Sequence, residues 1–342
     1  MFLSTKRLGK QTVKLSCPPS VAAGACVVGK KEGEGPLKNY FDYISDDSYF
    51  GEKSWEKAES TMLKQCFGIV CDKAKMPPSD IEYVFSGDLL NQCTGSAFAM
   101  RDSGIPYFGL YGACSTMAES LSLAAMAIDG GYCDRAVALT SSHFCSAERQ
   151  FRLPLEYGGQ RTPTAQWTVT GAGALALSAQ GPGPYITHVT TGKIVDAGIT
   201  DANNMGAAMA PAAYETLKAH FEDTGRDPSY YDAIVTGDLG MLGHEILLDM
   251  FLGDGVDLGP CCMDCGILIY AVDSQDVHSG GSGCGCSASV LAGHLLNGMT
   301  SGRWPKLLFA ATGALMSPTS SQQGESIPGI CHAVALETDR GC

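Results

Sequence analysis

The sequence predicts an α/β fold made of two duplicated halves, and two observations lead to this prediction. A helix–turn–strand segment that contains Pro78 recurs around Pro228, 150 positions later in the chain. Apolar runs flanked by helical patterns occur in both halves, which is typical of sheets covered by helices on both faces. We place the division after residue 180, which gives an N-terminal half of residues 1–180 and a C-terminal half of residues 181–342.

The repeated segment is clearest where its strand ends. Pro78-Ser-Asp-Ile-Glu-Tyr-Val-Phe-Ser-Gly-Asp-Leu89 aligns with Pro228-Ser-Tyr-Tyr-Asp-Ala-Ile-Val-Thr-Gly-Asp-Leu239, and Pro, Ser, Gly, Asp and Leu coincide. A helical pattern precedes each copy, at 58–71 and 212–221. Because the repeat is far longer than a solenoid unit, it indicates two halves related by a pseudo-twofold axis.

The other elements follow from shorter patterns. Uninterrupted apolar runs favour buried strands, and apolar residues at every third or fourth position favour helices. Helices are expected to begin at Cys114 and at Cys284 and to converge near the centre of the molecule. The expected strands are 107–111, 135–140, 171–178, 265–272 and 306–311.

Cys114 is the strongest single candidate for chemistry. It follows a Gly112-Ala113 turn between a strand and a helix, so backbone N–H groups and the positive end of the helix dipole would face its sulfur. Both favour the thiolate, the reactive form of cysteine. Cys114 is therefore a candidate nucleophile or the floor of an anion-binding pocket, although many cysteines only fill space in a core.

Composition limits the function. Of 342 residues, 45% are hydrophobic and the net charge is −13, which argues against nucleic acid and against simple electrostatic docking on anionic lipid. The sequence shows no secretory signal and no apolar run of membrane-spanning length, so we expect a cytoplasmic or peripheral protein. Its 15 cysteines are expected to be reduced.

Five of these cysteines have spacings that metal ligands also show. Small residues at tight turns explain the same spacing, and we expect no zinc or iron–sulfur site. They are Cys261, Cys262, Cys265, Cys284 and Cys286.

Several longer strings carry a family resemblance. With the Gly-Ala-Cys turn, they resemble the thiolase/ketoacyl-synthase superfamily and, within it, the stage V sporulation protein AD family of spore-forming bacteria. The strings are Ala147-Glu-Arg-Gln-Phe-Arg152, the stretches 156–171 and 192–211, and Gln322-Gln-Gly-Glu-Ser-Ile-Pro-Gly-Ile330.

The resemblance implies a thiolase-like fold with layers in the order αβαβα and a homodimer. It also implies binding of dipicolinic acid, a pyridine dicarboxylic acid, for uptake into the developing spore. Membrane-protein partners of the same sporulation complex, at the spore inner membrane, are implied as well. No acyl-transfer turnover is implied.

The residues around Cys114 agree with a protein that binds but does not catalyse. Condensing enzymes of the superfamily need a histidine after the strand of the second half, and here Gly237 or Asp238 stands at that place. A carboxylate cannot donate a hydrogen bond to a developing oxyanion unless it is protonated. His244 is expected to be a surface or capping residue of the following helix.

A dicarboxylate site needs hydrogen-bond donors and flat apolar walls. Three arginines are candidate donors to the ligand's carboxylates, if they do not form ion pairs within a loop instead: Arg149, Arg152 and Arg161. Phe144, Phe151, Tyr157 and Trp167 are candidate walls if they are not plain core. The expected ligand-binding residues are Asp88, Asn91, Cys114, Ser115, His143, Gln166, Thr168, Asp196, Asp201, Asn204, Asp238 and Cys284.

Carboxylates repel a bare dianion but suit a calcium chelate of dipicolinic acid. The string from Asp196 to Asn204 is rich in oxygens, yet it lacks the spacing of an EF-hand loop, and turn and N-cap chemistry explains it as well. Two other functions stay open: an active acyltransferase or condensing enzyme that uses Cys114, and a structural partner protein with a vestigial pocket.

Overall fold

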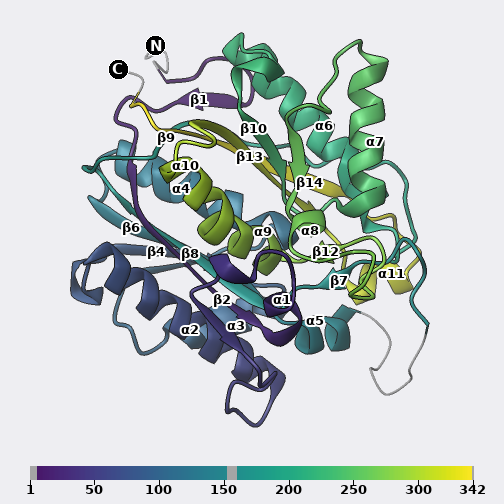
Figure 1. The fold of residues 1–342 in the computed structure, drawn as a ribbon, viewed down its shortest axis with the longest axis horizontal. Helices are drawn as coiled ribbons and strands as arrows, with labels where there is room; N and C mark the ends of the chain where they lie inside the picture. Colours follow the sequence, from purple (N-terminus) through teal and green to yellow (C-terminus); the bar gives the residue numbers. More distant parts are fainter. Residues whose placement is uncertain (1–5, 152–159, 341–342) are drawn as a thin grey trace.

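The computed structural model describes residues 6–151 and 160–340. Its strands form one large mixed sheet, and a two-stranded sheet lies beside it (Figure 1). The strands of the first half are β2 (Ser20–Gly29), β4 (Tyr83–Gly87), β5 (Tyr107–Gly109), β6 (Arg135–Ser142) and β8 (Gly171–Ser178). Those of the second half are β9 (Tyr185–Thr190), β10 (Ala233–Thr236), β11 (Cys262–Asp264), β13 (Lys306–Ala314) and β14 (Gly329–Glu337).

The two halves have the same strand order. Numbered within each half, the strands lie in the order third, second, fourth, fifth, first: β5-β4-β6-β8-β2 and β11-β10-β13-β14-β9. The fifth strand is antiparallel to both of its neighbours in each half. The halves join where Ser20 of β2 pairs with Tyr185 of β9. The predicted duplication is therefore confirmed, and the boundary at residue 180 stays a prediction.

Short strands complete the sheets. β1 (Thr12–Lys14) pairs with β9 and β3 (Tyr43–Ser45) with β2, while β7 (Trp167–Thr168) pairs with β12 (Gly281–Ser282).

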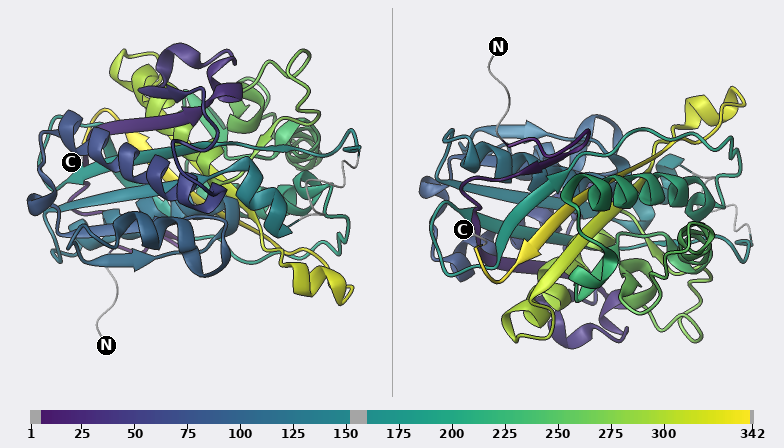
Figure 2. Two further views of the ribbon diagram at one scale, coloured as in Figure 1. Left: turned by 90° about the horizontal axis from the view of Figure 1, so that it is seen from below. Right: turned by 90° about the horizontal axis from the view of Figure 1, so that it is seen from above.

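Helices lie in three layers around the sheets. One outer layer holds α2 (Trp55–Ala74) and α3 (Thr94–Met100), and the other holds α6 (Met205–Thr224) and α7 (Gly240–Gly253). Figure 2 shows α2 lying across β2 and β8 and, in its other view, α6 lying across β13 and β14. The central layer holds α4 (Thr116–Asp129), α9 (Cys284–Val290), a π-helical turn η7 (Leu291–Leu295) and α10 (Leu296–Thr300).

The remaining helices are short. They are α1 (Lys30–Gly33), α5 (Phe144–Phe151), α8 (Cys265–Leu268) and α11 (Pro318–Gln322). The 3₁₀ turns are η1 (Lys38–Tyr40), η2 (Pro78–Asp80), η3 (Asn91–Cys93), η4 (Ala113–Ser115) and η6 (Pro228–Tyr230). Across residues 6–151 and 160–340, no helix combines the length and the apolar character needed to span a bilayer.

The hydrophobic core divides in the same way as the layers. Met117 and Leu121 of α4 belong to a central cluster, Met62 of α2 to one outer cluster and Leu217 of α6 to the other. Burying a Leu or Met side chain stabilises the fold by about 1.5–3 kcal/mol, so each layer contributes substantially. The αβαβα arrangement is confirmed.

The two long outer helices begin and end in the same way. The side chains of Ser54 and Asn204 accept N-cap hydrogen bonds, from Lys57 N and Ala207 N. Each helix then ends at a residue in the left-handed region, Lys75 for α2 and Gly225 for α6. The repeat found in the sequence therefore extends to the helix ends.

Two of the expected strands differ from the structure. Cys265–Leu268 is a helix, because the Asp264 side chain accepts a hydrogen bond from Ile267 N and caps it after the strand β11. The fifth strand of the second half is β14 instead. The expected strand at 107–111 is the edge strand β5, on which Phe108 is 50% exposed, so it is not buried.

Candidate functional site

The turn that carries Cys114 lies between β5 and α4. Ala113 has φ 51°, a conformation that is costly for a residue with a side chain, and it is the first residue of the 3₁₀ turn η4. Gly112 O accepts hydrogen bonds from Ser115 N at 3.1 Å and Ser115 Oγ at 2.7 Å. A Cβ atom on Gly313 would lie 2.3 Å from Gly112 O, so this glycine lets β13 pack directly against the turn.

The helix starts of the two halves meet at this point. Cys284 begins α9, and its side chain packs with Cys114, Leu89 and Ala147 in one small buried cluster. The Cys284 thiol donates a hydrogen bond to Ser141 O at 2.9 Å. The predicted convergence of the two cysteine-bearing helices is confirmed.

Asp238 is the charged group next to Cys114. It is fully buried, and its carboxylate accepts hydrogen bonds from Gly283 N at 2.8 Å and Thr312 Oγ1 at 2.9 Å. The Cys114 thiol lies close enough to interact with this carboxylate electrostatically. Burial raises the pKa of Asp238 to about 7, although these donors oppose the shift.

The Cys114 thiol is not activated. Its burial, and next the charge of Asp238, raise the pKa of the thiol well above its ordinary value. The sequence prediction of a thiolate at the helix start is therefore wrong. Loss of solvation and a neighbouring carboxylate outweigh the helix dipole, which contributes only about 0.3–2 kcal/mol.

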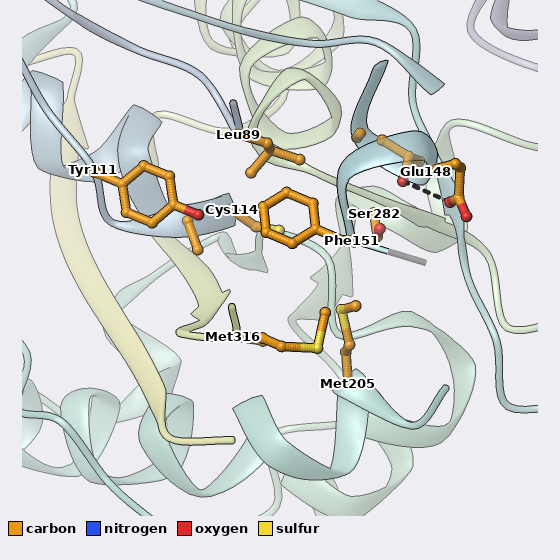
Figure 3. A pocket seen from close by; sticks show the side chains of 12 residues that line it. Leu89, Tyr111, Cys114, Glu148, Phe151, Met205, Ser282 and Met316 are labelled. Atoms are coloured by element: carbon orange, nitrogen blue, oxygen red, sulfur yellow. Dashed lines mark hydrogen bonds between the residues drawn. The ribbon is translucent and has the colours of Figure 1, made fainter. Parts of the chain in front are cut away.

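A small cavity opens beside Cys114 (Figure 3). Its volume is about 40 Å³. Thr168 and Glu148 are joined by a hydrogen bond of 3.1 Å in its wall. The residues that line it are Leu89, Tyr111, Ala113, Cys114, Ala147, Glu148, Phe151, Thr168, Met205, Ser282, Ala314 and Met316.

Several of the predicted residues come together here. Cys114 and Thr168 line the cavity, and Ser115 and Cys284 lie beside Cys114. Gln166 lies behind the wall, where its Nε2 donates to Asp238 O at 2.7 Å and Gly281 O at 2.9 Å. These two hydrogen bonds of Gln166 hold the backbone at Asp238 close to the backbone at Gly281.

Asp88 takes the place of Asp238 in the other half of the repeat. It is fully buried and accepts hydrogen bonds from Leu90 N at 2.8 Å and Ser96 N at 2.6 Å. Its charge acts on Glu59, a buried residue of α2 that accepts hydrogen bonds from two serine hydroxyls. Burial, and next the charge of Asp88, raise the pKa of Glu59 to about 8. Both carboxyls lie near Cys284.

The other predicted residues lie elsewhere. His143 Nε2 donates to Ser48 O at 2.8 Å, and His143 lines a different hollow beside Trp167. Asn91 lines a third, exposed hollow together with Arg149. Arg149 pairs with Glu56, and Arg152 and Tyr157 fall outside the described residues.

The string from Asp196 to Asn204 forms turns. Asp196 accepts hydrogen bonds from Gly198 N and Ser326 Oγ, and Asp201 accepts one from Asn203 N. Asn204 caps α6. None of the three lines the Cys114 cavity.

Histidines and metal ligands are scarce around the cavity. All seven histidines of the chain lie among the described residues, and none lines it. His244 lies on α7 near Asp264. In the part of the chain that the structure describes, no three His, Cys, Asp or Glu side chains are grouped to hold a metal ion, and the cysteines are unpaired.

Most of the apolar wall was missed by the sequence analysis. Met205 begins α6, Met316 follows β13 and Tyr111 follows β5, so these side chains come from three distant segments. Phe151 was expected as a wall and is one.

Solved structures define the class of fold. The chain is similar to 3-oxoacyl-[acyl-carrier-protein] synthase III from Aquifex aeolicus (TM-score 0.55, 10% identity, 93% of this chain and 99% of that one). It is also similar to OleA from Xanthomonas campestris (TM-score 0.59, 14% identity, 96% and 98%). The tetronic acid condensing enzyme AbyA1 gives a TM-score of 0.57 at 16% identity, over 93% and 99%. The fold is that of the thiolase/ketoacyl-synthase class.

The sequence comparisons define the family. The profile of stage V sporulation protein AD matches residues 9–337. Stage V sporulation protein AD of Bacillus subtilis (strain 168) is 44% identical over 337 residues, which cover 98% of this chain and 99% of that protein. This chain belongs to the stage V sporulation protein AD family.

Proposed function

We propose that this sporulation protein binds dipicolinic acid in the Cys114 cavity without covalent chemistry and serves its uptake into the developing spore. The observation that supports the proposal best is that Cys114 lines a largely apolar cavity whose described lining includes none of the seven histidines of the chain. The superfamily's nucleophile position is kept, while its neighbour is a carboxyl group.

The pair of Cys114 and Asp238 is unsuited to condensation. Attack on a thioester needs a thiolate and donors for the oxyanion that forms. Asp238 keeps the proton on Cys114, and its ionised carboxylate would repel an oxyanion. We therefore favour a binding protein over an active condensing enzyme.

The cavity offers suitable chemistry for a flat aromatic acid. Tyr111, Phe151 and two methionines provide apolar walls, and the Ser282 hydroxyl can donate to a carboxylate oxygen. A volume of about 40 Å³ holds only a few water molecules, so a ring needs the walls to open. Met205 and Met316 suit this movement, because methionine has three rotatable bonds.

Titration calorimetry with dipicolinic acid, with and without calcium, tests the proposal. We expect saturable binding by the native protein. Ala147→Leu fills the cavity and should weaken binding at least ten-fold. The matched control is Ala219→Leu, which adds the same atoms to a half-buried position of α6 and should bind normally.

Two outcomes would contradict the proposal. One is the absence of binding by natively folded protein under both conditions. The other is an acyl adduct on Cys114 after incubation with acyl thioesters, detected by mass spectrometry. If Ala147→Leu still binds dipicolinic acid normally, the binding site lies outside this cavity.

We also propose that the protein works as a homodimer with membrane-protein partners at the spore inner membrane. Family membership supports both points. Calcium can accompany the ligand as its chelate, and the ligand's own oxygens would then supply part of the coordination.

A further inference from the structure

A second hollow lies beside Trp167, and its volume is about 370 Å³. Pockets that bind small molecules span about 300–1,000 Å³, so this one has room for a small organic ligand. It lies between the start of α1, the loop after β3, the start of α5 and the strand β7 (Figure 1). We call it the Trp167 hollow, and its lining includes Lys30, Lys31, Glu34, Asp46, Phe144 and Trp167.

The Trp167 hollow is separate from the Cys114 cavity, although the same two elements border both. On α5, Phe144 lines the hollow, whereas Ala147 lines the cavity. On β7, Trp167 lines the hollow and Thr168 the cavity, because neighbouring residues of a strand point to opposite faces. No described residue lines both, so the hollow is a site of its own.

Stacked aromatic rings form the apolar wall of the hollow. The rings of Phe144 and Trp167 lie nearly parallel, with their centroids 3.8 Å apart. Lys31 Nζ lies over the Trp167 ring, 4.1 Å from its centroid. Arg161 lies over the same ring and pairs with Asp276. Such a wall suits an aromatic ligand, because aromatic pairs gain interaction beyond the area that they bury.

The rim of the hollow carries both signs of charge. Lys30 and Lys31 supply two ammonium groups, and Glu34 and Asp46 supply two carboxylates. Lys30, Glu34 and Asp46 are exposed, and none has an ion-pair partner among the residues that the structure describes. Lys31 donates to Gln275 O, but an ammonium has three donors and can still bind a carboxylate.

The other titratable groups of the hollow offer a ligand no further charge. His143 is neutral, because its Nδ1 accepts a hydrogen bond from Cys145 N while its Nε2 donates to Ser48 O. Burial raises the pKa of the Cys145 thiol, which therefore stays protonated. Glu32 is only 1% exposed, and its carboxylate accepts a hydrogen bond from the Tyr270 hydroxyl. A ligand thus meets two ammonium groups and two carboxylates.

We propose that the Trp167 hollow binds an aromatic α-amino acid. The ligand's carboxylate faces the two lysines, its ammonium faces the two acidic residues of the rim, and its ring packs against the stacked aromatic wall. A dianion or a dication would instead bring like charges together at the rim. The binding is non-covalent, and this inference goes beyond the proposed function and does not depend on it.

The ¹⁵N NMR signals of the indole N–H groups locate the ligand, because the chain has three tryptophans. L-phenylalanine should shift the Trp167 signal saturably, with a Kd of about 1 mM or tighter. It should leave the signal of Trp304, which lies in the central core, unchanged. Trp167→Phe assigns the signal.

Two analogues test the need for both charges. Phenylacetate lacks the ammonium and phenethylamine lacks the carboxylate, and each should bind about two- to five-fold more weakly than L-phenylalanine, as expected for one exposed ion pair.

A double variant tests the acidic side of the rim. Glu34→Gln with Asp46→Asn should bind L-phenylalanine about two- to five-fold more weakly than the native protein. The same variant should bind phenylacetate no more weakly, because it has lost only groups that repel this anion. The matched control is Glu222→Gln with Asp339→Asn, which removes two exposed carboxylates elsewhere and should bind L-phenylalanine normally.

Four results would overturn the inference. They are no shift of the Trp167 signal at about 10 mM L-phenylalanine, equal or tighter binding of either analogue, unchanged L-phenylalanine binding by the double variant, and lost L-phenylalanine binding in Ala147→Leu, which would place the ligand in the Cys114 cavity. None of these results bears on dipicolinic acid, and absence of dipicolinic acid binding would leave this inference standing.

Discussion

At the scale of single residues, the contact between Cys114 and Asp238 decides the chemistry. The sequence identified both positions, because a Gly-Ala-Cys turn and a Gly-Asp repeat are local signals. It could not give the charge state of Cys114, because that depends on how far burial removes water and on which side chain reaches the sulfur. Those facts come from the packing of η4 against β13 and α9.

The first prediction concerns the reactivity of Cys114. We expect slow alkylation by iodoacetamide at about pH 7.5, and at least ten-fold faster alkylation in Asp238→Asn, because the variant lacks the charge that disfavours the thiolate. Cys17 is exposed and serves as the internal reference in the same mass spectra. Equal rates at Cys114 in both proteins would contradict this assignment.

The second prediction concerns pH. Burial raises the pKa of Asp238 in the folded protein to about 7, from an ordinary value of 3.8, so the stability it contributes is present at low pH and is lost as the pH rises through 7. Relative to the native protein, Asp238→Asn should therefore gain about 2–4 kcal/mol of unfolding free energy between about pH 4 and pH 8. Urea denaturation at both pH values measures this difference. A constant difference would show that Asp238 does not titrate in this range.

At the scale of elements, the sequence predicted what local patterns determine. The strand 171–178 was placed correctly, because its apolar run is bounded by Gly and turn residues. The expected strand 265–272 was wrong, because Asp264 caps a helix there. The strands β2, β9 and β14 were not predicted, and the cavity wall needed three segments that only the tertiary fold brings together.

The close packing of β8 on α9 gives a third prediction. A Cβ atom on Gly173 would lie 2.3 Å from the backbone C and O of Ala288. Gly173→Ala should therefore destabilise the protein by at least ~2 kcal/mol. Gly68→Ala is the matched control, since nothing lies within 4 Å of its Cβ position on α2, and it should stabilise by about 0.5–1 kcal/mol. Similar urea midpoints for the two variants would contradict the packing described.

At the scale of the whole molecule, the duplication explains where the site lies. Asp88 and Asp238 follow equivalent strands of the two halves, and equivalent helices begin near Cys114 and Cys284, so four chemically distinctive residues gather near the axis between the halves. The repeat in the sequence predicted this convergence. The size of the cavity could not be predicted, because it depends on side chains such as Phe151 and Met316 that fill it.

The fourth prediction concerns the dimer. β5 is an edge strand with unpaired backbone groups, and Phe108 on it is 50% exposed. We expect two copies to meet there about a twofold axis. Light scattering should show a dimer for the native protein and a monomer for Phe108→Asp. Tyr132→Asp is the control, because Tyr132 is 77% exposed and lies off the sheet edge. A native monomer at micromolar concentration would refute the prediction.

A crystal structure of the protein soaked with dipicolinic acid tests the central claim most directly. We predict electron density for the intact ligand beside Cys114, with Met205 and Met316 displaced and no bond to the sulfur. Density at another site with this cavity unchanged, or a covalent adduct on Cys114, would contradict the account.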